Sequence, residues 1–183
     1  MAKVISQMMV SLDGYIEGKN KEIDWHNVDE EYNTYAARLL DSADVLLFGK
    51  NTYQLMENYW PTREAVLNDP IIAEKMNQLT KIAFSTSLKK AKWQNTRIVS
   101  ENVTEEILQL KKQSTKDIVI LGSTHLVSYL TKMKLIDEFQ IMINPIVLGS
   151  GTSYFIDVEE KLHLTLVKTK RFASGNVLLC YQT

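Results

Sequence analysis

The chain of 183 residues is 45% hydrophobic and 23% charged, a composition typical of one globular domain with a single continuous core. Its 21 basic and 22 acidic residues leave a net charge of −1, which lacks the basic excess that binds nucleic acid or anionic membranes. A single cysteine, Cys180, excludes a disulfide framework or an iron–sulfur cluster within one chain. No apolar run reaches the ~20 residues that span a bilayer, and the opening residues lack the pattern of a secretory signal. We therefore expect a cytoplasmic protein without nucleic-acid or membrane partners.

The first half of the chain predicts alternating strands and helices. Residues 3–12 are rich in Val, Ile and Met and predict a buried strand, which the turn at Asp13-Gly14 ends. Residues 29–43 carry apolar side chains at helical spacing, with acidic residues in the first turn that suit the helix dipole. The elements expected next are a strand over 45–48, a helix over 52–58, a helix capped by Asp69 with Pro70 at its first position, and strands over 81–85 and 97–100.

The second half continues this alternation and then becomes strand-rich. A helix is expected over 102–114, where Asn102 and Glu105 have the spacing of a capping box. The elements expected after it are a strand over 118–121, a helix over 124–132, and strands over 138–144, 162–169 and 177–182. Uninterrupted apolar strands are typical of parallel sheets covered on both faces. The order predicts an α/β domain with a mostly parallel sheet that ends in antiparallel strands.

Two strand ends carry glycines that suit a nucleotide. Gly49 and Gly122 each follow a short apolar strand and precede a helix. Helix N-termini at the carboxyl ends of strands offer free N–H groups to phosphates, and glycine permits close backbone approach. Residues 49–53 and 122–125 are therefore candidates for holding two parts of a nucleotide. Alternatively, each glycine only ends its strand. Neither GxGxxG nor GxxxxGK[ST] occurs, which disfavours dinucleotide folds of that type and P-loop enzymes.

Other polar residues offer weaker signals. The hydroxyls of Ser85-Thr86-Ser87 could bind phosphate or cap a turn, and Lys50 could pair with a ribose phosphate or be a solvated surface lysine. The three histidines are scattered, so no metal site is predicted, and GxSxG is absent. Cys180 lies in an apolar strand and is interpreted as a core residue.

Carboxylates gather around Trp25 in the sequence. They are Asp13, Asp24, Asp29 and Glu30. A carboxyl group beside an indole in a cleft would have its pKa raised by desolvation and could pass a proton. The alternative is that each of them caps a helix or is a solvated charge.

Several segments together resemble a known family. They are residues 9–16 (MVSLDGYI) with Asp24-Trp25, 44–53 (DVLLFGKNTY), 120–123 (ILGS), 135–139 (LIDEF), 144–151 (NPIVLGSG) and Phe155. In this order they resemble the dihydrofolate-reductase-like superfamily, and most of all the reductase domain of bifunctional riboflavin-biosynthesis deaminase-reductases and its stand-alone bacterial relatives. The resemblance implies one three-layer α/β domain over residues 1–183, with helices flanking a mixed, mostly parallel sheet whose C-terminal strands are antiparallel.

The resemblance also implies a cofactor, NADPH, and the residues that hold it. Carried over by position, the cofactor-binding residues are Gly49, Lys50, Asn51 and Thr52 for the phosphates, Ser85 and Thr86 for the adenosine side, and Gly122, Ser123, Thr124 and His125 for the pyrophosphate. Lys50 would favour the 2′-phosphate of NADPH over NADH. Ser123 stands where the family has the second glycine of a pair. The nicotinamide would lie near Met9, Val10 and Ile16.

The activity that the resemblance implies is hydride transfer to a small heterocycle. The substrate would be a pyrimidine of the riboflavin pathway, such as 5-amino-6-(5-phosphoribosylamino)uracil, or a pterin or folate-like compound. Glu30 or Asp13 would orient the substrate or donate a proton, beside Trp25, Met9 and Ile16 as substrate-binding residues. Val28 replaces a proline usual in that stretch, so Asp29 is an alternative to Glu30. The alternative function is an NADP(H)-binding or sensing protein without turnover. Relatives of this kind also suggest a homodimer.

Overall fold

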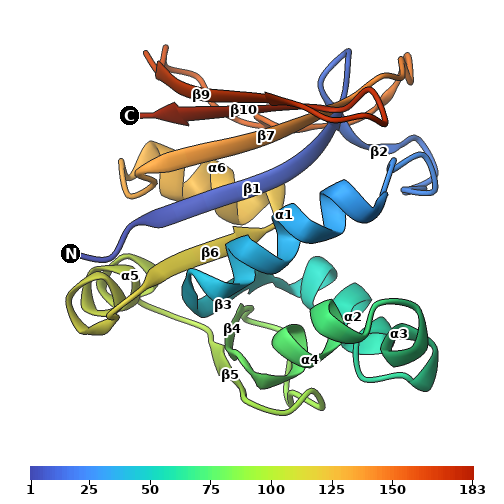
Figure 1. Cartoon of the computed structure of the whole chain (residues 1–183). Helices are drawn as coiled ribbons and strands as arrows, with labels where there is room; N and C mark the ends of the chain where they lie inside the picture. The colour runs from blue at the N-terminus through green and yellow to red at the C-terminus, as the bar shows by residue number, and fades with distance from the viewer.

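The structure, a computed structural model, describes residues 1–183 as one large sheet between two layers of helices (Figure 1). The strands are β1 (Val4–Ser11), β2 (Tyr15–Gly18), β3 (Ala43–Gly49), β4 (Thr80–Phe84), β5 (Thr96–Val99), β6 (Asp117–Leu121), β7 (Glu138–Asn144), β8 (Gly151–Ser153), β9 (Thr165–Arg171) and β10 (Val177–Gln182). The helices are α1 (Glu30–Asp41), α2 (Lys50–Tyr59), α3 (Arg63–Asn68), α4 (Pro70–Gln78), α5 (Val103–Gln113) and α6 (Thr124–Lys132).

Eight strands form the main sheet, in the order β5-β4-β3-β6-β1-β7-β10-β9. Every pairing from β5 to β7 is parallel, and β10 runs antiparallel to both of its neighbours. The remaining strands, β2 and β8, pair with each other as a separate antiparallel ribbon. The ends of the parallel strands therefore meet at one edge of the sheet, where the loops to the helices begin.

Side chains of the central strands alternate between two hydrophobic clusters. On β3, Val45 and Leu47 belong to a cluster with residues of α5 and α6, whereas Leu46 and Phe48 face residues of α1, α2 and α4. Because both faces are covered by helices, these strands are apolar without interruption. This arrangement confirms the predicted three-layer α/β fold.

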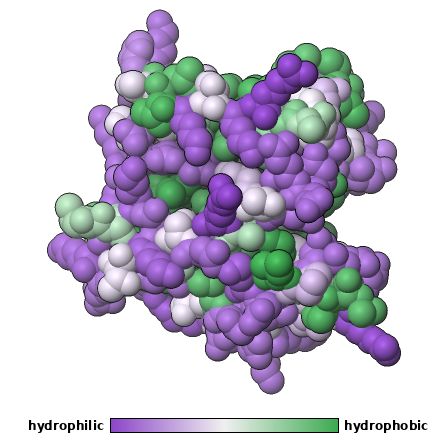
Figure 2. Space-filling view, viewed as in Figure 1, coloured by the Kyte–Doolittle hydropathy of each residue, from purple (hydrophilic) through white to green (hydrophobic).

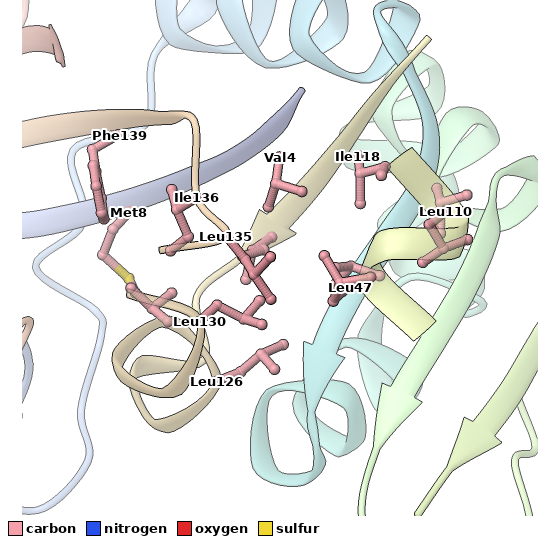
Figure 3. Packing of buried hydrophobic residues seen from close by; sticks show 14 of the residues in the cluster. Val4, Met8, Leu47, Leu110, Ile118, Leu126, Leu130, Leu135, Ile136 and Phe139 are labelled. Carbon is pink, nitrogen blue, oxygen red and sulfur yellow. The ribbon is translucent and has the colours of Figure 1, made fainter. Parts of the chain in front are cut away.

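The larger cluster contains 18 buried residues and fixes α6 against the sheet. Figure 3 shows Met8 of β1 above Leu130 and Leu126 of α6, with Leu135 and Ile136 between helix and strand. The face of the molecule in Figure 2 is mostly hydrophilic, with separate hydrophobic groups between polar ones. None of the helices has the length and apolar character needed to cross a membrane.

Asp69 and Asn102 occupy the predicted N-cap positions of α4 and α5, but neither side chain makes the capping hydrogen bond. Asp69 precedes α4, but its side chain caps no helix N–H and instead accepts a 2.9 Å hydrogen bond from Asn33 Nδ2 of α1. Asn102 has a left-handed backbone and caps nothing with its side chain, so the capping box with Glu105 does not form. Pro70 does occupy the first position of α4.

The strand boundaries differ most near the C-terminus. The strand predicted over 162–169 is β9, which begins at Thr165, and Leu162 to Leu164 lie outside it. Helix α3 and the short strands β2 and β8 were not predicted. Each of these three elements has only three to six residues, too few to display a periodic pattern.

Candidate functional site

The two glycine turns lie side by side at the carboxyl edge of the sheet. Strands β3 and β6 are parallel neighbours, with Leu47 opposite Ile120, so the turns after both strands emerge together. The backbone N–H of Gly49 donates a 2.8 Å hydrogen bond to Ser123 Oγ. The sequence separates these residues by 74 positions, and the sheet register brings them into contact.

Close packing and backbone geometry both restrict residue 122. Gly122 has φ +64°, and a Cβ atom there would lie 3.0 Å from Thr52 Cγ2. Ser123, the next residue, also has a positive φ of 65°. Left-handed backbone at two successive positions turns the chain sharply from β6 into α6. A side chain at position 122 would therefore be strained by its backbone angle and would press on the Thr52 side chain of α2.

Helices α2 and α6 begin at these turns without side-chain caps. Gly49 and Ser123 are their N-cap residues, and neither helix has an acidic residue in its first turn. In contrast, α1 and α3 are capped by Asp29 and Thr62. The first N–H groups of an α-helix have no partner within the helix and carry the positive end of its dipole. Two such N-termini at one edge of the sheet therefore have the character of an anion-binding site.

A polar pocket of about 400 Å³ lies at this edge. Seven of the ten predicted cofactor-binding residues line it: Gly49, Lys50, Asn51, Thr52, Ser123, Thr124 and His125. Lys21 and Glu17 of the β2 region also line the pocket, and the Glu17 carboxylate accepts hydrogen bonds from Lys21 Nζ and Thr152 Oγ1. Since Glu17 is paired with Lys21, the charge of Lys50 and the two helix N-termini make the pocket electropositive.

Lys50 lines the pocket and is half-buried, so it differs from a freely solvated lysine. Its Nζ donates a 2.9 Å hydrogen bond to Ser87 Oγ. Ser85 Oγ accepts from the backbone N–H groups of Ser87 and Leu88, which is the turn-capping alternative considered for this segment. Neither Ser85 nor Thr86 is among the residues that line the polar pocket.

A second, apolar pocket of about 590 Å³ begins on the other side of the Gly122 turn. It lies between β1, α1, α2 and α4, and 16 of its 21 lining residues are hydrophobic. Its aromatic wall consists of Tyr32, Tyr35, Tyr59 and Trp60. Helix α2 links the two pockets, because its first turn borders the polar one while Leu55 and Met56 border the apolar one. The volume is in the ~300–1,000 Å³ range of small-molecule sites.

Two residues that line this apolar pocket carry a buried side-chain nitrogen without a hydrogen bond of normal geometry. They are Gln7 of β1, whose side chain lies beside the Tyr32 hydroxyl, and His26 in the loop before α1. Desolvation lowers the pKa of His26, so its imidazole is neutral near pH 7, and its ring packs edge-on against Trp25 at 4.5 Å between centroids. Burial also raises the pKa of Tyr32 to about 12, which keeps that phenol protonated. The polar groups of this pocket are therefore uncharged near pH 7, except for the carboxylate of Asp69.

The acidic residue that lines the apolar pocket is Asp69, which sequence reasoning had assigned to a helix cap. Its Oδ1 accepts from Asn33 Nδ2, another lining residue. Gln7, His26, Asn33 and Asp69 were all missed as site residues. Gln7 alone gave a signal, since it is a polar residue within the apolar stretch of β1.

The predicted catalytic carboxylates lie elsewhere. Glu30 is exposed and does not line the apolar pocket; it borders an adjoining polar pocket of about 420 Å³, which shares Asn33, Asp69 and Ile72 with the apolar one. Asp13 borders none of the three pockets described, and its carboxylate accepts from Ser11 Oγ and the N–H groups of Leu148 and Gly149. The hydrogen bond from Ser11, followed by those two N–H groups, holds the pKa of Asp13 below its usual value, opposite to the rise that a proton donor needs.

The predicted substrate-binding residues are divided between the pockets. Met9 lines the apolar pocket, and Ile16 lines the polar one. Trp25 lines neither, but its neighbour His26 lines the apolar pocket. Asp29 accepts a 2.7 Å hydrogen bond from Tyr32 N as the N-cap of α1, which is the capping role considered for it.

The fold and the paired pockets define a three-layer α/β protein whose strand ends border a cleft with a polar and an apolar compartment. The chain belongs to the RibD C-terminal domain family, whose model matches residues 2–178. It is 33% identical over 179 residues to the uncharacterized protein YyaP of Bacillus subtilis (strain 168), covering 98% of this chain and 94% of YyaP.

Solved structures share the fold at lower identity. A Shewanella sp. PV-4 protein provisionally assigned to riboflavin biosynthesis superposes with a TM-score of 0.77 at 22% identity, covering 100% of this chain and 98% of that one. A Thermotoga maritima diaminohydroxyphosphoribosylaminopyrimidine deaminase/5-amino-6-(5-phosphoribosylamino)uracil reductase gives a TM-score of 0.69 at 16% identity, covering 99% of this chain and 56% of that one. The chain is therefore similar in fold to riboflavin-biosynthesis reductases, as the sequence motifs indicated.

Proposed function

We propose that this protein is an NADPH-dependent reductase of a small heterocyclic substrate. The observation that carries the proposal is the convergence of two uncapped helix N-termini, those of α2 and α6, on one electropositive pocket that opens beside an apolar one. Membership of the RibD C-terminal domain family supports it, because solved neighbours include a protein named as a uracil reductase.

The residues of the polar pocket fit the phosphates of NADPH. The free N–H groups at the start of α2 and α6 would donate to the pyrophosphate, as helix N-termini do in other nucleotide sites. Lys50 would pair with the 2′-phosphate, and its bond to Ser87 holds it at the mouth of this pocket. Gly49, which lines this pocket, presents no side chain toward it.

The apolar pocket would hold the reacting rings. Its lining is mostly hydrophobic, and the four aromatic residues offer faces on which flat rings can stack. When bound, NADPH would supply a hydride, that is, one hydrogen nucleus with two electrons, to a double bond of the substrate. Water would supply the accompanying proton. The chain's contribution is then positioning, for which no nucleophile or metal is required.

Binding and turnover are tested separately. Isothermal titration of the full chain with NADPH and with NADH, in wild type and Lys50→Ala, measures the preference for the 2′-phosphate. We expect wild type to bind NADPH at least tenfold more tightly than NADH and the variant to lose most of that preference. Lys89→Ala, an exposed lysine outside both pockets, is the matched control. Equal affinity of wild type for both nucleotides would contradict the assignment of Lys50.

The alternative, a sensor that binds NADP(H) without turnover, makes a different prediction. It requires tight NADPH binding with no oxidation in the presence of pterins, pyrimidines or flavins. The predicted homodimer is tested independently by light scattering on the eluting peak of a size-exclusion column.

A further inference from the structure

We infer that the apolar pocket takes a flat, uncharged ring without a phosphate, and that a phosphoribosyl pyrimidine is not its ligand. The inference rests on the proposed function and deepens it, because it concerns the substrate of the same protein. Three features of the pocket carry it: its charge, its rim and its aromatic wall.

The charges of the two pockets differ. The apolar pocket has no lysine or arginine among its 21 lining residues, and its one carboxylate belongs to Asp69. The polar pocket has Lys21, Lys50 and two helix N-termini. A phosphate dianion transferred from water into an apolar site beside a carboxylate loses hydration without gaining an opposite charge. Phosphate recognition is thus concentrated in the pocket assigned to the cofactor.

The rim of the apolar pocket is hydrophobic as well. Ile23, Val28 and Leu55 line it and are 36%, 50% and 51% exposed. A ribosyl phosphate that left the pocket past these three side chains would cross an apolar surface before reaching water. A ligand with an uncharged tail, or with no tail, brings no charged group into contact with this apolar surface.

The aromatic wall suits a flat ring. Tyr32, Tyr35, Tyr59 and Trp60 line the pocket and provide faces on which such a ring can stack.

The test uses two matched pairs of ring compounds, riboflavin with riboflavin 5′-phosphate and uridine with uridine 5′-phosphate. Each pair carries a flat, uncharged ring and differs only in the phosphate. They are titrated calorimetrically into the full chain with saturating NADP⁺, so that no reduction consumes them. We expect the phosphate-free member of at least one pair to bind at least tenfold more tightly than its phosphate ester.

A charge introduced at the rim provides the converse test. Leu55→Lys should reduce the discrimination against the phosphate ester by threefold or more, whereas Leu108→Lys on α5, 43% exposed and away from the pocket, should not change it. If both phosphate esters bind wild type as well as their partners, or if NADP⁺ binds but no phosphate-free ring does, the inference is wrong while the proposed function stands. If NADP⁺ itself does not bind, the proposed function fails.

Discussion

The hydrogen bond from Gly49 N–H to Ser123 Oγ, 2.8 Å long, joins the ends of β3 and β6 at the point where the cleft opens. Ser123 makes this bond while its backbone is in the left-handed region, at φ 65°. The side chain thus stabilises the junction, and the backbone conformation opposes that stabilisation.

Substitutions at Ser123 separate these two effects. Ser123→Ala loses the hydrogen bond and keeps the backbone strain, so we expect a loss of about 1 kcal/mol in the free energy of unfolding. Ser123→Gly loses the same bond but removes the strain, and should be more stable than the alanine variant by about 1 kcal/mol. Urea denaturation of the three proteins measures both differences. An alanine variant as stable as the glycine variant would show that the strain is negligible.

Gly122→Ala should destabilise the protein through both backbone and contact. A non-glycine residue at φ +64° costs about 1–2 kcal/mol, and the new methyl group would press on Thr52 Cγ2. Gly149→Ala is the matched control, since its φ is +74° and nothing lies within 4 Å of the added carbon. The loss at Gly122 should therefore exceed that at Gly149, and a Thr52→Ser background should shrink the excess. Equal losses at the two glycines would refute the contact.

Lys81 is a buried cation that ends α4. Its side chain is fully inaccessible, and Nζ donates to the carbonyl oxygens of Met76, Asn77 and Leu79 at 2.8, 3.1 and 2.7 Å. Lys81→Met keeps the length but leaves these carbonyls without their donor, so we expect a loss of at least about 2 kcal/mol. Lys75→Met on α4 removes a surface ion pair with Asp41 and should cost under about 1 kcal/mol. Thermal and urea unfolding of both variants tests whether Lys81 stabilises the fold by donating to the carbonyl groups at the end of α4.

Asp44 should contribute to acid sensitivity. The N–H of Lys116, followed by the N–H and hydroxyl of Thr115, holds the pKa of Asp44 below its usual value of 3.8. The unfolded chain therefore takes up a proton at higher pH than the folded one, so this stabilisation is complete above about pH 5 and is lost as the pH falls through 3.8 and below. Asp44→Asn should be less stable at pH 7 and should lose less stability on acidification. Parallel pH curves for variant and wild type would count against this role.

The parallel strands and their glycine ends could be predicted from the sequence because each signal is local. The runs at 45–48 and 118–121 are apolar without interruption, and sheet register then brings Gly49 and Gly122 together. The sequence could not show that the Asp69 side chain leaves α4 uncapped, because a hydrogen bond from Asn33, 36 residues away, decides the orientation of that side chain. The apolar pocket was missed for a similar reason. Tyr32 and Tyr35 follow helical spacing, and only the tertiary structure shows that they line a cavity.

The central claim, that the N-termini of α2 and α6 bind the phosphates of NADPH, is tested most directly by amide NMR. A ¹⁵N-labelled full chain is titrated with NADPH, and backbone resonances are followed residue by residue. We predict that the largest shifts fall on residues 50–52 and 124–126, whose N–H groups begin the two helices. Saturable shifts confined to other parts of the chain, or no shifts at all, would contradict the account.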